Sequence, residues 1–117
     1  MEETIRNQFI EQVNRLNDNN AILIEDDYQN SIEVKEIEKE VFMLTAPLFI
    51  YKNNNSEDEI KTQLKSFRYP HFIAKTLILA GEPNERQLFS VTTLLFKDME
   101  QFAKIFEIEK LLTYEEI

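Results

Sequence analysis

Apolar residues recur at helical spacing in three separate stretches of this chain, and residues of high β propensity lie between them. A helix is predicted over residues 5–16, a second helix ends near Arg68, and a third covers about residues 99–112. The residue before Pro70 avoids helical dihedral angles, so the second helix stops there. The apolar positions of the first two helices are Ile5, Phe9, Val13 and Leu16, then Ile60, Leu64 and Phe67.

Two of the predicted helices begin with a capping box. Ser56 is followed three residues later by Glu59, and Asp98 is followed at the same spacing by Gln101. In this motif the first side chain accepts a hydrogen bond from the backbone N–H of the fourth residue, a group that the helix itself leaves unpaired. The motif predicts that the second helix starts close to residue 57 and the third at residue 99.

Five strands are predicted between the helices, in a group of three and a group of two. They have the short apolar runs, the alternation and the β-branched and aromatic residues that strands favour. Their expected ranges are 21–24, 31–37 and 41–51, then 72–80 and 86–96. The segment 81–84 (GEPN) has the glycine and proline of a hairpin turn between the last two strands.

Residues 31–46 also have an alternative interpretation as a helix. Four apolar residues there fit a helical stripe, and Asn30 with Glu33 fits a capping box. The β-branched and aromatic residues of the segment 41–51 instead favour two strands with a turn near residues 38–40. Pro47 then marks an edge position or a bulge, because proline has no N–H for a central ladder.

The predicted elements follow the order helix, three strands, helix, two strands, helix (α-βββ-α-ββ-α). We expect a single α+β domain over residues 1–117, with an antiparallel sheet of about five strands and three helices. The apolar content of 43% is enough for a packed core. Both faces of the last two strands are apolar, so one face meets the core and the other meets a helix or a second subunit.

The chain has few of the residue types that catalysis and cofactor binding use. It contains no cysteine, one histidine (His71) and one glycine (Gly81). These counts exclude disulfides and glycine-rich phosphate loops, and they argue against a zinc site or a serine triad. The acidic run 25–27 lacks EF-hand spacing and is interpreted as a solvated turn. We predict no catalytic residue, metal or cofactor; an enzyme that uses carboxylates alone is a minor alternative.

The net charge of −9 lies entirely in the first half of the chain. Residues 1–60 have 14 acidic and 5 basic side chains, whereas residues 61–117 have 8 of each. This balance argues against nucleic-acid binding, which relies on Lys and Arg. An acidic surface suits a basic protein partner, or it simply maintains solubility. The acidic N-terminus and the lack of a long apolar run predict a cytoplasmic protein without a signal peptide or membrane insertion.

Three phrases of the sequence, together with the order of the elements, resemble a known family. Residues 21–27 (AILIEDD) are similar to the first strand and acidic turn of the class I type III secretion chaperones. Residues 41–48 (VFMLTAPL) are similar to the third strand of that family, which often ends in a small-Pro-Leu phrase. Residues 76–79 (TLIL), the strand to Phe96 and the apolar final helix resemble its closing hairpin and helix.

The resemblance implies a non-catalytic chaperone that holds, without ATP, the extended N-terminal segment of a secreted effector or gatekeeper protein. It also implies a homodimer, or a heterodimer with a related chaperone. The implied dimer contact consists of Ile60, Leu64, Phe67, Ile73, Leu77 and Leu79. The implied client-binding residues are Phe9, Val13, Ile22 and Ile24, and the acidic rim that sets specificity is Glu25, Asp26 and Asp27.

A second hypothesis is a small acidic inhibitor or immunity protein that plugs a basic site on a folded partner. The negatively charged first half would then be the contact surface, and binding would depend strongly on salt. Such a protein would be monomeric. The sequence leaves both hypotheses open.

Overall fold

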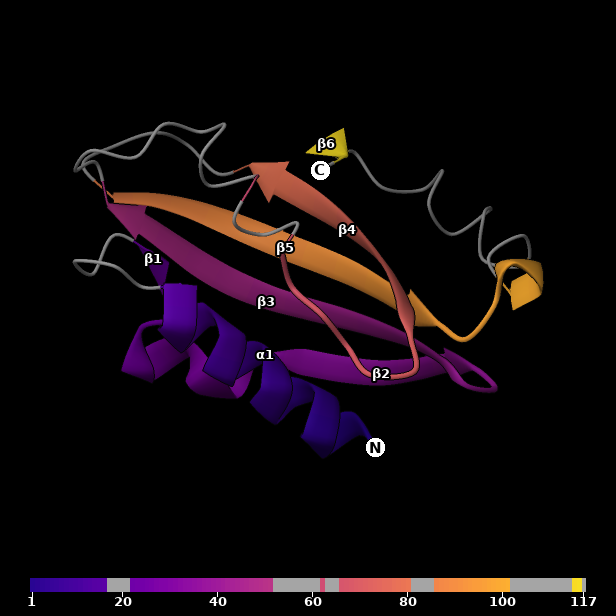
Figure 1. The fold of residues 1–117 in the computed structure, drawn as a ribbon. Coiled ribbons are helices and arrows are strands. Elements are labelled where there is room, and N and C mark those ends of the chain that lie inside the picture. The colour runs from indigo at the N-terminus through magenta and orange to yellow at the C-terminus, as the bar shows by residue number, and fades with distance from the viewer. Residues whose placement is uncertain (17–21, 52–61, 63–65, 81–85, 102–114, 117) are drawn as a thin grey trace.

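The computed structural model describes residues 1–16, 22–51, 62, 66–80, 86–101 and 115–116. These residues form a single α+β domain in which one helix, α1 (Glu2–Leu16), packs on an antiparallel sheet (Figure 1). A short 3-10 helix, η2 (Asp26–Ser31), connects the first two strands. The strands are β1 (Ile22–Leu23), β2 (Glu33–Glu38), β3 (Val41–Tyr51), β4 (Ile73–Ala80), β5 (Arg86–Phe96) and β6 (Glu115–Glu116).

Strands β3 and β5 form the centre of the sheet. They are antiparallel and pair without a break from Val41 opposite Phe96 to Tyr51 opposite Arg86. Strand β4 lies on the other side of β5, and the two-residue β6 pairs with β4. The outer edge of β3 is shared, because β2 pairs with its first half and β1 with its last residues. The long connection from β3 to β5 therefore places strands distant in sequence side by side (Figure 1).

Pro47 lies at the one kind of position in β3 where proline is tolerated. The β2 pairing ends at Thr45, and the β1 pairing starts at Phe49. Pro47 thus falls in the gap between the two outer partners, where the outer edge of β3 is locally free of both strands. The expected edge position for this proline is confirmed.

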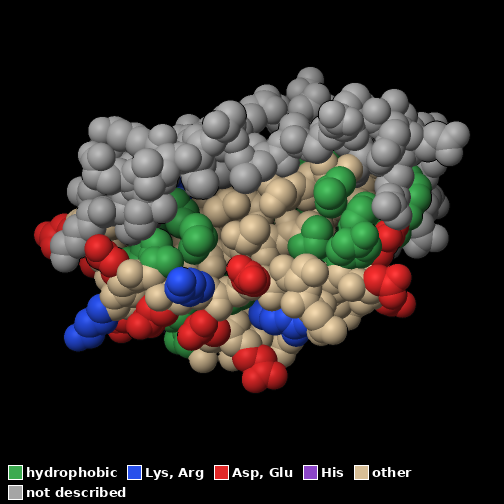
Figure 2. Space-filling model, turned by 180° about the vertical axis from the view of Figure 1, so that it is seen from behind, with side chains coloured by type: hydrophobic (Ala, Val, Ile, Leu, Met, Phe, Trp, Pro, Cys, Tyr) green, Lys and Arg blue, Asp and Glu red, His purple; other side chains and the backbone are tan. Residues whose placement is uncertain are grey.

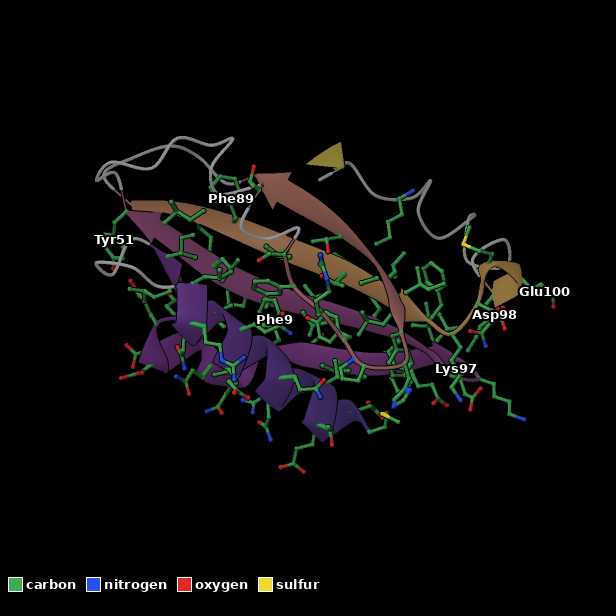
Figure 3. All side chains as sticks on the ribbon, in the orientation of Figure 1. Phe9, Tyr51, Phe89, Lys97, Asp98 and Glu100 are labelled. Atoms are coloured by element: carbon green, nitrogen blue, oxygen red, sulfur yellow. The ribbon has the colours of Figure 1, made fainter. Side chains whose placement is uncertain are left out.

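One face of the sheet and one stripe of α1 form the main core. Alternate residues of β3 and of β5 point toward α1, as the period of two in a strand requires. Phe9 lies between the helix and the sheet and is fully buried (Figure 3). The core residues contributed by β3 and β5 are Phe42, Leu44, Ala46, Leu48, Ile50, Phe89, Val91 and Leu95.

The five predicted strands are all present, and residues 31–46 form strands rather than a helix. Strands β3 and β5 have the predicted bounds, and the bounds of the other three differ by one or two residues. The second strand starts at Glu33 because residues 26–31 form η2 instead. Helix α1 starts at Glu2, three residues earlier than expected, and two glutamates occupy its first turn, where negative charge favours the helix dipole. The β2–β3 pairing includes an irregularity between Glu36 and Glu38.

The predicted cap of the third helix is confirmed at its first turn. The backbone N–H of Gln101 donates to Oδ1 of Asp98 over 3.0 Å, and residues 99–101 are helical. Two contacts join this turn to the β2–β3 turn. Lys97 Nζ forms an ion pair with Glu40 Oε1 at 2.7 Å, and Gln101 Nε2 donates a hydrogen bond to the Lys39 carbonyl. The remainder of that helix, the helix expected before Arg68 and the turn 81–84 lie outside the described residues, apart from residues 62 and 66–68.

Candidate functional site

The four predicted client-binding residues lie in the core. Phe9, Val13, Ile22 and Ile24 are between 0% and 8% exposed and belong to one cluster between α1 and the sheet. Side chains buried to this extent are not accessible on the surface of this chain, and their binding of a client stays a prediction. Their helical and strand spacing identified the inner faces of α1 and β1 correctly, but burial assigns them to stability instead of binding.

The residues predicted at a dimer contact are in different environments. Phe67 is buried, and its ring packs edge-on against Phe9 with the centroids 5.2 Å apart, so it is a core residue rather than a contact for a partner. Ile73 is 44% exposed at the start of β4 and remains accessible. The backbones of Leu77 and Leu79 lie in β4, where Leu77 pairs with Glu116. Ile60, Leu64 and the side chains of Leu77 and Leu79 lie outside the described residues.

The predicted acidic rim begins at the end of β1 and enters η2. Glu25 is the residue before η2, and its Oε1 accepts a hydrogen bond from the Tyr51 hydroxyl over 2.6 Å. Asp26 and Asp27 form the first turn of η2 and are exposed. The rim therefore consists of one anchored carboxylate and two carboxylates on the surface.

A groove runs beside α1, between the helix and the segment that precedes β4. It consists of two hollows, of about 370 Å³ and about 300 Å³, that share Gln8 and Pro70 in their lining. Leu16 and Phe67 line the first hollow, and Phe72 lines the second. These five residues define what we call the α1 groove. No motif or spacing in the sequence indicates this groove, because its two walls are more than 50 residues apart in the chain.

Gln12 of α1 contacts the far wall of the α1 groove, in addition to the ring contact between Phe9 and Phe67. The amide group of Gln12 hydrogen-bonds both the N–H and the carbonyl group of Arg68. Tyr69, the next residue, is buried in the core. The segment around Arg68 is thus fixed in a defined position relative to α1, which keeps the groove open.

A second candidate surface lies on the face of the sheet opposite α1. Tyr28 of η2 packs on Phe49 of β3 with ring centroids 4.9 Å apart, and Phe49 pairs with Leu88 of β5. Tyr28 and Leu88 are 40% and 41% exposed, whereas Phe49 is buried. We call these three residues the Tyr28 patch. Figure 2 shows hydrophobic side chains in two groups on this face, with acidic side chains beside the group on the right.

The described residues offer little acid–base or metal chemistry. His71 is exposed just before β4. Burial raises the pKa of the Tyr69 hydroxyl well above its usual value. Within the described ranges no three histidine, aspartate or glutamate residues gather as a metal site would require. The same part of the chain contains no helix with the length and apolar character needed to span a membrane.

Comparison of the chain with protein-family models finds no match, and neither curated proteins nor solved structures match it. A function is therefore inferred from the residues and their geometry.

Proposed function

We propose that this chain is a non-catalytic, ATP-independent chaperone of the class I type III secretion kind, acting in the cytoplasm. It would hold the extended N-terminal segment of a secreted effector or gatekeeper protein. The described elements support this proposal because one helix is followed by three strands and later by two, as in that family; η2 and the two-residue β6 are additional to that order. The acidic composition and the small number of catalytic residue types also support a non-catalytic chaperone.

The α1 groove is the observation that carries the proposal. Its lining combines apolar side chains, which accept apolar side chains of a client, with amide groups such as Gln8, which can hydrogen-bond an extended backbone. Helix α1 has 15 residues and is therefore about 22 Å long. An extended segment of about seven residues would cover this length. Client binding would thus use the outer side of α1, while Phe9 and Val13 support the helix from within.

Dimer formation is part of the proposal, and β4 is the element that would carry it. Ile73 presents an exposed apolar side chain at the start of this strand. Strand β6 pairs with β4 at Leu77 and Ile78, beyond the end that carries Ile73. A homodimer or a heterodimer with a related chaperone would bury Ile73.

The experiment is capture of the client by the tagged protein, followed by limited proteolysis and mass spectrometry. We expect one larger protein, protected only in an N-terminal segment. Pro70→Glu places a charge in the middle of the groove and should abolish capture. Asn14→Glu adds the same charge at an exposed position of α1 outside the groove and should leave capture intact. Circular dichroism establishes that both variants fold.

Equal capture by both variants would remove the α1 groove from the proposal. The acidic inhibitor is the second candidate, and the exposure of Asp26 and Asp27 favours it. Its signature would be capture of a compact folded enzyme that elutes with salt and is lost on charge reversal of the acidic rim. A protease-protected segment that stays bound in salt would contradict that alternative.

A further inference from the structure

We propose that the Tyr28 patch is a docking surface for a basic partner segment that carries an apolar anchor residue. This surface is separate from the α1 groove and lies on the opposite face of the sheet. The proposal does not depend on the chaperone function, since it rests on the exposure and the charge of residues at the η2 end of the sheet.

The apolar part of the surface is continuous across three elements. Phe49 is only 2% exposed; Tyr28 packs against its ring, and the register pairs Phe49 with Leu88 of the neighbouring strand. Directly paired residues on one face of a sheet have their Cβ atoms about 5 Å apart. Tyr28 and Leu88 are therefore the residues of this surface that a partner can contact, and the buried Phe49 lies beside both of them.

The charge beside this surface specifies the partner. Residues 24–32 contain the three acids of the rim and no base. Asp26 and Asp27 are exposed next to Tyr28 in the chain, so their carboxylates are available to a cation. One described base lies nearby, because Arg6 donates to the Gln29 carbonyl at 2.8 Å. Among the described side chains of η2 and its neighbours, the acids of the rim outnumber it.

The aromatic ring of Tyr28 adds a second reason for a cationic partner. A Lys or Arg side chain is attracted both by a carboxylate and by the face of an exposed aromatic ring. A partner residue such as Leu or Phe between two basic residues could rest between Tyr28 and Leu88 while its neighbours reach Asp26 and Asp27. Aromatic and arginine residues are also the commonest contributors to binding energy at protein interfaces.

A second copy of this chain is a poor occupant of the Tyr28 patch. A two-fold contact through this surface would bring the same residues of two copies together. The acidic pairs Asp26 and Asp27 of both copies would then lie in one interface, where like charges are costly. The charge complementarity therefore favours a different, basic partner.

The test uses the full chain with two short blocked peptides, one alternating lysine with leucine and the other alternating glutamate with leucine. Binding is measured by calorimetry at low and high salt, and its position by backbone amide chemical shifts. We expect the lysine peptide to bind, to shift the amides of residues 26–28, 49 and 88, and to lose affinity with salt. The glutamate peptide should not bind.

Matched variants localise the charge contribution. Asp26→Asn with Asp27→Asn should weaken binding of the lysine peptide by about tenfold, because two exposed charge contacts are lost. Glu2→Gln with Glu3→Gln makes the same change in net charge at the start of α1 and should have little effect. Leu88→Ser should weaken binding, whereas Met99→Ser, at another exposed apolar residue, should not.

Three results would overturn the proposal. Equal losses in the two acid-pair variants would mean that the peptide responds only to total charge. Shifts confined to other surfaces, or absence of binding by the folded protein, would remove the Tyr28 patch as its site. Self-association of the free protein that Leu88→Ser abolishes would assign the surface to a second copy instead.

Discussion

The side-chain amide of Gln12 replaces a backbone partner for Arg68. Its Nε2 donates to the Arg68 carbonyl over 2.9 Å, and its Oε1 accepts from the Arg68 N–H over 2.8 Å. These two groups are the ones that a neighbouring strand would pair. One helical residue thus satisfies both polar groups of a residue 56 positions away and fixes the wall of the α1 groove.

Gln12→Ala should lower the free energy of unfolding by about 1 kcal/mol, because it removes two hydrogen bonds that are partly open to solvent. It should also weaken client capture, since the segment at Arg68 would lose its fixed position. Gln8→Ala, one turn earlier on the same groove, is the control for stability. Urea denaturation measures the free energy of unfolding of both variants. If the two variants lose equal stability, the paired bonds of Gln12 have no special role.

Phe9→Ala distinguishes a core residue from a client-binding residue. The side chain is fully buried and packs against Phe67, so its removal should cost about 3–5 kcal/mol of unfolding free energy. Asn7→Ala, at an exposed position of the same helix, should change stability by less than about 0.5 kcal/mol. Thermal and urea unfolding provide the measurement. A Phe9→Ala variant of unchanged stability that failed to hold a client would restore the original assignment.

The inner faces of the elements could be predicted from the sequence, whereas the surfaces between elements could not. The spacing of Ile5, Phe9 and Val13 identified the buried stripe of α1, and the residues of the segment 41–51 identified the long central strand. Periodicity reports which residues share a face, but it does not report what covers that face. The spacing therefore placed Phe9 on the apolar face of α1, but it did not show that the sheet covers this face.

The candidate sites needed contacts between distant parts of the chain. Tyr28 and Leu88 are 60 positions apart, and only the β3–β5 register brings both of them to Phe49. The acidic rim is three consecutive acidic residues in the sequence, 25–27, so it needs no long-range contact to be recognised. Its position at the start of η2 agrees with the expected turn. Pro70 predicts the end of a helix, and in the structure it is also the first central residue of the turn that precedes β4.

Tyr69→Phe should be at least as stable as the parent protein at neutral pH. The Tyr69 hydroxyl is buried, and it has no hydrogen-bond partner among the described residues. A buried hydroxyl without a partner is unfavourable, so its removal should be neutral or stabilising by up to about 1 kcal/mol. Urea unfolding at neutral pH measures this difference. Loss of more than about 1 kcal/mol would show that the hydroxyl has a stabilising partner.

The same residue predicts a pH dependence at the alkaline side. Burial raises the pKa of the Tyr69 hydroxyl in the folded protein, while in the unfolded chain it titrates near its usual value of about 10. The unfolded state therefore releases this proton first, and stability falls as the pH rises above about 10. Tyr69→Phe should lose less stability over this range than the parent. Tyr28→Phe, at a more exposed tyrosine, should follow the parent curve.

His71 has a backbone conformation that normally suits glycine. Its φ is 69°, and the N–H of Phe72 donates to the Tyr69 carbonyl over 3.2 Å, which closes a turn with Pro70 and His71 at its centre. Proline followed by a residue of positive φ is the signature of a type II turn, in which glycine is preferred at the second central position. The chain places a histidine there at an energetic cost.

Two substitutions separate this backbone cost from the loss of the imidazole. Both His71→Gly and His71→Ala remove the side chain, but only glycine adopts a positive φ without a steric penalty. We expect His71→Gly to exceed His71→Ala in unfolding free energy by about 1 kcal/mol, although glycine has the larger entropy to lose on folding. Urea denaturation gives the comparison. A His71→Ala variant that is more stable than His71→Gly would mean that the turn relaxes to a negative φ, where only the entropy difference between the two residues remains.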